Sequence, residues 1–136
     1  MSESQCHIEL VKRVLNYVKT IVDSSLHDLI EVDDSTSNKP SRVVGNYIPD
    51  VYFFYDKRII LGEAKTLDDF ERKHSQEQFL AYFSACSSYG ESGMIVVAVP
   101  WKLVNTAKNL FRRKKRELNS LIKIVVLDDI GSVFFV

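Results

Sequence analysis

Residues 49–65, Pro-Asp-Val-Tyr-Phe-Phe-Tyr-Asp-Lys-Arg-Ile-Ile-Leu-Gly-Glu-Ala-Lys, carry the clearest structural signal in this chain of 136 residues. Aromatic and β-branched residues favour two strands here, about Val43–Tyr55 and Arg58–Lys65, joined near Asp56-Lys57. Apolar side chains occupy both alternating faces of the first segment, which is typical of a central strand covered on both sides. The segment therefore predicts a hairpin inside a sheet.

The register of this hairpin decides which polar side chains meet. If Tyr55 pairs with Arg58 across a two-residue turn, Asp50 lies directly opposite Glu63, with Cβ atoms about 4.5–5.5 Å apart. Lys65 then points from the same face as Glu63. Opposed like charges destabilise a sheet unless a cation neutralises them, and hard carboxylate oxygens suit Mg²⁺ or Mn²⁺. A three-residue turn would shift the register by one, and Asp-Lys is not a favoured hairpin turn, so both registers stay open.

Hydrophobic periodicity and turn residues predict the elements around the hairpin. A polar loop is expected over 33–40, and Ser75 with Gln78 matches a capping box that opens a helix. The whole chain, 1–136, is expected to be one domain of the α/β (α+β) class, with a central mixed sheet flanked by helices. The predicted elements are a helix over Cys6–Val22, a short strand over Leu29–Val32, the hairpin, a helix over Gln76–Ser88, a strand over Ser92–Val99, a basic helix over Trp101–Arg116, a strand over Ile122–Leu127 and a tail strand over Ser132–Val136.

Composition is that of an ordinary globular protein, with 46% apolar and 26% charged residues and a formal net charge of zero. No stretch approaches the roughly 18–20 apolar residues of a membrane span, and the polar N-terminus lacks the order of a signal peptide. Cys6 and Cys86 have no metal-type spacing and are interpreted as reduced thiols of a cytoplasmic protein, although a disulfide stays open.

Two groups of residues resemble motifs of a known protein family. Pro49-Asp50, followed thirteen residues later by Glu63-Ala64-Lys65, resembles the motif of the PD-(D/E)XK nuclease superfamily. Gln78 and Tyr82 resemble the QxxxY motif of the branch similar to RecB nuclease domains, and one helical turn separates them, so both can face one site. The resemblance covers about Cys6 to Leu127 and implies a restriction endonuclease-like αβββαβ core.

The resemblance also implies a function, the metal-dependent hydrolysis of DNA phosphodiesters in restriction, repair, recombination or mobile-element biology. Asp50, Glu63 and the carbonyl of Ala64 would hold Mg²⁺ or Mn²⁺, which would polarise the phosphate. Lys65 would stabilise negative charge in the transition state, and Gln78 and Tyr82 would complete the catalytic site. Some members add an acidic ligand from the first helix, where Glu9 is the natural candidate, although it falls on the polar face.

Charge distribution suggests where DNA would bind. Between residues 102 and 123 there are eight Lys or Arg residues and one acid, Glu117. On the basic helix, Lys108, Arg112, Arg113 and Arg116 could meet phosphates, or could form a solvated face. The histidines His7, His27 and His74 show no metal-ligand spacing, and only His74, between the motif strand and the Gln78 helix, is placed for a substrate contact.

Other interpretations of the same residues stay open. Asp50, Glu63 and Lys65 could form a salt-bridged hairpin end, Gln78 could only cap a helix and Tyr82 could only pack in the core. The chain would then be a catalytically inactive nucleic-acid-binding or scaffold module of the same fold. A domain this small offers little surface for a substrate, so a homodimer or higher homo-oligomer is expected. The apolar tail Val133–Val136 could be its interface, an edge strand or part of the core.

Overall fold

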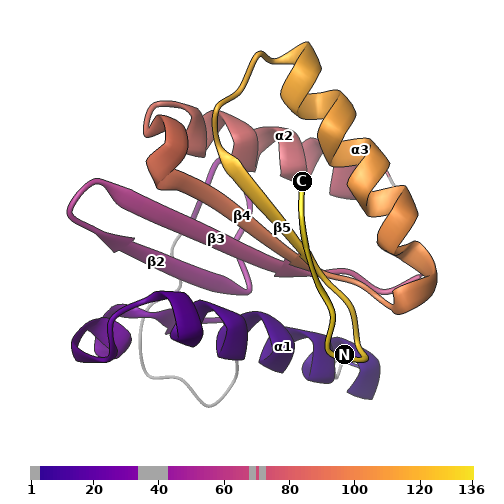
Figure 1. Ribbon diagram of the computed structural model, residues 1–136, viewed down its shortest axis with the longest axis horizontal. Helices are drawn as coiled ribbons and strands as arrows, with labels where there is room; N and C mark the ends of the chain where they lie inside the picture. Colours follow the sequence, from indigo (N-terminus) through magenta and orange to yellow (C-terminus); the bar gives the residue numbers. More distant parts are fainter. Residues whose placement is uncertain (1–3, 34–42, 68–69, 71–72) are drawn as a thin grey trace.

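The structure, a computed structural model, describes residues 4–33, 43–67, 70 and 73–136, which form three layers (Figure 1). Helix α1 (Gln5–Ile21) covers one face of the sheet, and α2 (Lys73–Ser87) and α3 (Val104–Glu117) cover the other. The sheet has the order β1 to β6, with β3, β4 and β5 parallel and the other neighbours antiparallel. The predicted mixed sheet flanked by helices is confirmed. The strands are β1 (Glu31–Val32), β2 (Val51–Tyr55), β3 (Arg58–Ala64), β4 (Gly93–Ala98), β5 (Lys123–Leu127) and β6 (Val133–Phe135).

The hairpin between β2 and β3 has the two-residue turn. Tyr55 pairs with Arg58, and Asp56 and Lys57 have φ angles of 49° and 64°. Positive φ at both central residues defines a type I′ turn, which matches the twist of the flanking strands. The turn therefore forms although neither residue is a glycine or asparagine, and the register that places Asp50 beside Glu63 is confirmed.

Two expected element boundaries are wrong. The first hairpin strand begins at Val51 rather than Val43, because the preceding residues form a tight Val44–Tyr47 bridge around Gly45, whose φ is +62°. Helix α2 begins at Lys73, so Ser75 lies inside its first turn, where it is buried. The capping-box prediction for the start of this helix is therefore incorrect.

Short 3-10 segments lie between the main elements, at Ser24–Leu29, at Gly90–Ser92 and at Trp101–Leu103, where the helix predicted from Trp101 has its first turn. Most of the predicted loop over 33–40 falls outside the described residues. Within the described residues, no helix is long and apolar enough to cross a membrane. Both cysteines are free thiols, Cys6 exposed and Cys86 buried.

Helix α1 packs closely on the sheet through Leu10, Val14 and Val18, all buried and spaced for one helical face. Gly62 of β3 makes this approach possible, because a Cβ atom there would lie 2.4 Å from Cγ1 of Val14. The glycine directly before Glu63 thus sets how near α1 comes to the motif strand.

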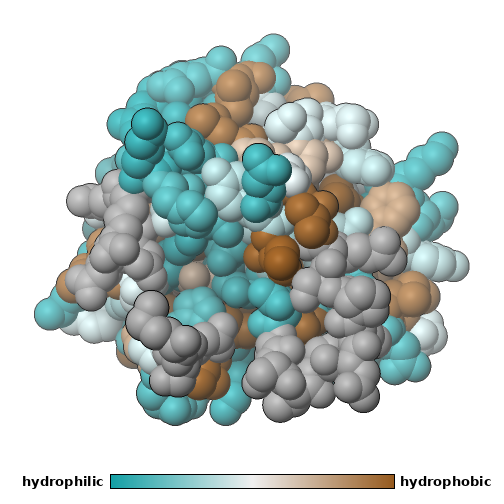
Figure 2. All heavy atoms as spheres, turned by 180° about the vertical axis from the view of Figure 1, so that it is seen from behind, coloured by the Kyte–Doolittle hydropathy of each residue, from teal (hydrophilic) through white to brown (hydrophobic). Residues whose placement is uncertain are grey.

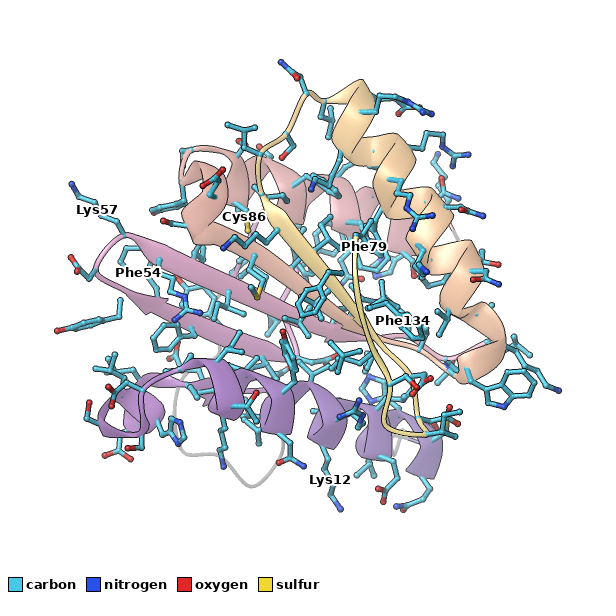
Figure 3. All side chains as sticks on the ribbon, in the orientation of Figure 1. Lys12, Phe54, Lys57, Phe79, Cys86 and Phe134 are labelled. Atoms are coloured by element: carbon cyan, nitrogen blue, oxygen red, sulfur yellow. The ribbon has the colours of Figure 1, made fainter. Side chains whose placement is uncertain are left out.

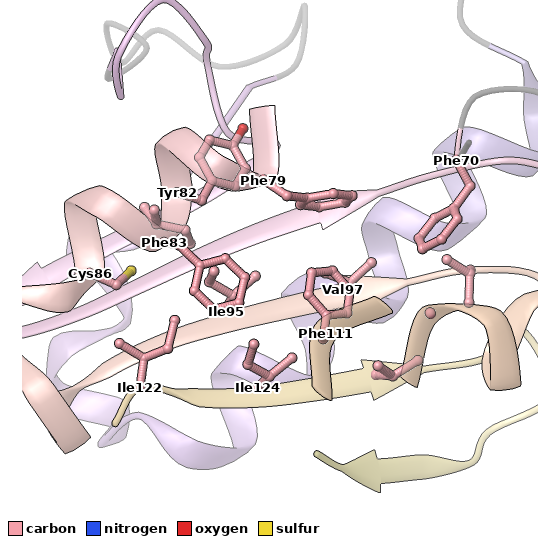
Figure 4. Close-up of a cluster of buried hydrophobic side chains, with 14 of the residues drawn as sticks. Phe70, Phe79, Tyr82, Phe83, Cys86, Ile95, Val97, Phe111, Ile122 and Ile124 are labelled. Atoms are coloured by element: carbon pink, nitrogen blue, oxygen red, sulfur yellow. The ribbon is translucent and has the colours of Figure 1, made fainter. Parts of the chain in front are cut away.

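An aromatic cluster fixes α2 and α3 on the opposite face (Figure 4). The ring of Phe111 on α3 lies 5.0 Å from that of Phe79 and 6.2 Å from that of Phe83, centroid to centroid. Because Phe79 and Phe83 point inward from α2, the intervening turn carries Gln78 and Tyr82 toward the sheet as well.

The C-terminal tail forms an edge strand that is half in the core. Phe134 of β6 packs against the aromatic cluster near α3, whereas Phe135 is 73% exposed on the other face (Figure 3). The side of the molecule shown in Figure 2 is largely hydrophilic, with apolar residues in small groups. The tail therefore combines the core and edge-strand roles considered for it.

Candidate active site

Asp50 and Glu63 lie side by side where β2 begins and β3 ends. Asp50 is 7% exposed and Glu63 is 4% exposed, so both carboxyl groups are withdrawn from water. Oδ2 of Asp50 accepts a 2.9 Å hydrogen bond from the backbone N–H of Ala64. In a strand, the N–H and C=O of one residue point toward the same neighbour, so the carbonyl of Ala64 also faces the side of Asp50.

Helix α2 supplies two donors to Glu63. The hydroxyl of Tyr82 donates a 2.6 Å hydrogen bond to Oε1 of Glu63, and Nε2 of Gln78 donates to the same oxygen at 2.9 Å. Nε2 of Gln78 also lies 2.9 Å from the Tyr82 hydroxyl. Gln78 is therefore not a helix-capping residue alone, and Tyr82 is both a core residue and a partner of Glu63. Within the described structure, the buried Oε1 of Gln78 accepts no hydrogen bond, which leaves an acceptor at this site.

Lys65 is the third motif residue and is 8% exposed. Its backbone N–H donates to the carbonyl of Ala98, which holds it on the sheet just beyond β3, and its Nζ lies 6.0 Å from the Phe79 ring centroid. Among the described residues, no ion pair joins Lys65 to Asp50 or Glu63, although the charge of Lys65 lowers the pKa of Glu63.

The pKa values of the two carboxyl groups are shifted in opposite directions. Burial raises the pKa of Asp50, but hydrogen bonds from His7, Glu63 and the Ala64 N–H outweigh it, and the pKa falls below its ordinary value. Burial and the neighbouring charge of Asp50 hold the pKa of Glu63 well above its ordinary range, against the opposing effects of Lys65 and Tyr82. The Glu63 carboxyl group therefore takes up a proton more readily than the Asp50 carboxyl group.

His7 is the site residue that the sequence analysis missed. Its Nε2 lies 3.5 Å from Oδ2 of Asp50, although its spacing gave no reason to select it. One signal was present, because His7 continues the buried stripe of α1 at helical spacing from Leu10 and Val14.

The other first-helix and histidine candidates lie elsewhere. Glu9 is exposed and bonds to Gln5 at 2.7 Å and to Lys12 at 3.8 Å, so it is not directed at the carboxylates. His27 donates to carbonyl groups at the end of α1, and His74 lies edge-on to Tyr47 with centroids 5.3 Å apart.

The basic residues of α3 divide between two sides of the helix. Nζ of Lys108 lies 4.9 Å from the Phe134 ring centroid, toward β6. Arg113 lies 3.9 Å from Glu117 on another side, and Arg112 and Arg116 are exposed. Because α3 starts where β4 ends and runs back along the sheet, its arginines lie in the half farther from the carboxylates.

A cation at this site would have few protein ligands. The described residues contain no group of three or more His, Cys, Asp or Glu side chains arranged to hold a metal ion. The nearby donors are the two carboxylates, the Ala64 carbonyl and the His7 imidazole. Mg²⁺ keeps several waters and is commonly held by one or two carboxylates, so this donor set suits it.

Comparisons of the chain with protein-family models, with curated proteins and with solved structures gave no match.

Proposed function

We propose that this chain is a metal-dependent nuclease of the PD-(D/E)XK superfamily that hydrolyses phosphodiester bonds of DNA. The observation that carries the proposal is the buried pair of Asp50 and Glu63 on adjacent strands, with Lys65 following on the same strand. Gln78 and Tyr82 support it, because both bind Glu63 and so face the same site, as the QxxxY resemblance implies. The order of helix, three strands, helix and strand is compatible with a restriction endonuclease-like core.

A divalent cation fits the charge of the site. Two buried carboxyl groups side by side are unfavourable when both are charged, and a bound cation would relieve that repulsion. Asp50, Glu63 and the Ala64 carbonyl would hold Mg²⁺ or Mn²⁺, and the His7 imidazole, 3.5 Å from Oδ2, would orient Asp50. When bound, the cation would act as a Lewis acid on the phosphate.

The protein's own residues would perform the remaining tasks. The Lys65 ammonium, withdrawn from water, would stabilise the negative charge that develops on the phosphate oxygens. Gln78 and Tyr82 would hold Glu63 in one orientation, so that no reorganisation is needed during the reaction.

A cleavage assay with a matched variant tests the proposal. Supercoiled, linear, single-stranded and four-way-junction DNA are incubated with Mg²⁺, Mn²⁺ or a chelator. The proteins are the wild type, Glu63→Gln and Glu77→Gln, since Glu77 is an exposed glutamate paired only with Lys73 among the described residues. We expect metal-dependent cleavage that Glu63→Gln abolishes and Glu77→Gln retains, and the preferred DNA would define the substrate.

The alternative is a catalytically inactive nucleic-acid-binding or scaffold module. It predicts no cleavage of any of the four DNA forms and no heat of Mg²⁺ binding in titration calorimetry, with normal folding. Cleavage that persists in excess chelator would also contradict the proposed mechanism.

The edge strand β6 supports self-association as part of the proposal. Its N–H and C=O groups at Phe134 face β5, because the Val136 N–H bonds to the Ile124 carbonyl and hydrogen-bonded pairs alternate. The backbone groups of Val133 and Phe135 therefore face outward, beside exposed apolar side chains. A homodimer or higher homo-oligomer formed along this edge would appear in sedimentation equilibrium and weaken in Phe135→Lys.

A further inference from the structure

A groove of about 470 Å³ lies between α2 and α3. Four residues on one side of α3 line the groove, and their spacing is that of a single helix face. They are Thr106, Asn109, Leu110 and Arg113. Gln76 of α2 and Phe70 also line it among the described residues. The groove is therefore built from the first turn of α2 and most of one side of α3.

Ring contacts connect this groove to the proposed active site. The Phe70 ring lies 6.0 Å from that of Phe79, and Nζ of Lys65 lies 6.0 Å from the Phe79 ring centroid. Two aromatic residues, Phe70 and Phe79, therefore separate the groove from the lysine that we assign to the scissile phosphate.

The part of the lining that the structure describes can bind a phosphate. Thr106 offers a hydroxyl, Asn109 an amide and Arg113 a guanidinium group. Arg113 is 57% exposed, and its contact with Glu117 is long at 3.9 Å. An exposed ion pair of this kind contributes little to the stability of the fold. A phosphate could therefore replace Glu117 as the partner of Arg113 at a small cost in free energy.

We propose that this groove binds one strand of the nucleic-acid substrate at a distance from the scissile phosphate, an inference that rests on the proposed nuclease function. Thr106 and Arg113 are seven residues apart, a rise of about 10 Å along the helix, which a strand of one or two nucleotides spans. A space of about 470 Å³ between two packed helices takes that length of a single strand, whereas a duplex would lie across the outer surface. Phosphates meet Arg113 and Asn109, and sugar or base atoms contact Leu110.

Arg113 and its neighbour Arg112 make the assignment testable. Arg112 is exposed and points about 100° away from Arg113 around the helix. It follows Lys108 and precedes Lys115 at helical spacing, and these two lysines contact Phe134 and the Val136 carbonyl at β6. The two arginines carry equal charge, but only Arg113 lines the groove.

The experiment measures fluorescence anisotropy of a labelled single-stranded oligonucleotide in chelator, so that binding is observed without cleavage. We expect Arg113→Gln to weaken binding about tenfold and to reduce the slope of log K against log salt by about 0.7, the loss of one phosphate contact. Asn109→Asp should weaken binding at least as much by repulsion. Arg112→Gln should have a smaller effect, and Lys12→Gln, exposed on α1 across the sheet, should have none.

Equal losses for Arg112→Gln and Arg113→Gln would overturn the groove assignment, because they would indicate a diffuse basic surface. Failure of the wild type to bind a single strand, or binding only to duplex, would also overturn it. The binding assay contains no metal, so its result tests only the groove and not metal-dependent cleavage. In the same way, a protein that fails to cleave DNA can still be compared with its variants for binding. Thermal melting of each variant excludes unfolding as the cause of a loss.

Discussion

The Tyr82 hydroxyl donates a 2.6 Å hydrogen bond to Oε1 of Glu63 from a side chain that has no exposed surface. The Tyr82 ring packs edge-on to Phe79 inside the aromatic cluster, so its position is set by the core. Burial and the neighbouring Glu63 charge raise the pKa of Tyr82, which keeps the hydroxyl protonated and donating. A rigid core residue thereby fixes the orientation of a proposed metal ligand.

Replacing Tyr82 by Phe tests this arrangement. Loss of the donor should raise the pKa of Glu63 further, because the hydrogen bond from Tyr82 lowers it in the wild type. The acidic limb of the pH–rate profile should therefore move to higher pH, and cleavage at neutral pH should fall about tenfold. Tyr55→Phe, an exposed tyrosine at the hairpin turn, is the matched control. An unshifted acidic limb in Tyr82→Phe would show that the hydroxyl does not act on Glu63.

Local signals in the sequence predicted most of the architecture. The order of elements followed from hydrophobic periodicity, and the pairing of Asp50 with Glu63 followed from the register of a single hairpin. Gln78 and Tyr82 could be placed beside the motif because residues four apart on a helix share a face. Each of these inferences depends on contacts that are close in sequence or fixed by one turn.

The errors have a common physical origin in contacts between distant segments. His7 meets Asp50 because α1 packs across the sheet, and the helical spacing that places His7 on the buried stripe of α1 does not identify Asp50 as its partner. Residues 43–50 have strand-like composition, but the Val44–Tyr47 bridge and the turn at Gly45 stop pairing with β3 before Val51. Ser75 is drawn into α2 because the helix starts two residues earlier.

The raised pKa of Glu63 predicts a specific dependence of stability on pH in chelator. A carboxyl group whose pKa is higher in the folded state favours folding at low pH, and this contribution is lost as pH rises through the folded value. The melting temperature of the wild type should therefore fall from mildly acidic toward alkaline pH more than that of Glu63→Gln, which stays neutral. The lowered pKa of Asp50 has the opposite sign and adds stability that is lost only on acidification, in both proteins. Parallel melting curves across this range would contradict a raised pKa of Glu63 in the folded state.

Lys65→Met should remove catalysis while the fold persists. Methionine keeps the length and apolar stem of the buried side chain but lacks the ammonium group that would stabilise the transition state. Cleavage should fall by about 10²–10³-fold with little change in melting temperature. Lys12→Met, an exposed lysine on α1, should cleave like the wild type. Full activity in Lys65→Met would remove Lys65 from the proposed mechanism.

Gly62→Ala should weaken the contact between α1 and the motif strand. The added Cβ would lie 2.4 Å from Cγ1 of Val14 and 3.0 Å from Cβ of Val51, so the helix or the strand must shift. We expect a loss of about 1–3 kcal/mol in the free energy of unfolding, measured by urea titration. The shift would also move His7 relative to Asp50, since both elements carry the site.

A double-mutant cycle isolates that contact. Val14→Ala alone leaves a cavity and should destabilise the protein, but in the Gly62→Ala background it removes the clashing methyl group. The double variant should therefore be less destabilised than the sum of the two single changes. Strict additivity would mean that the cost of Gly62→Ala arises from Val51 within the sheet, and not from the approach of α1.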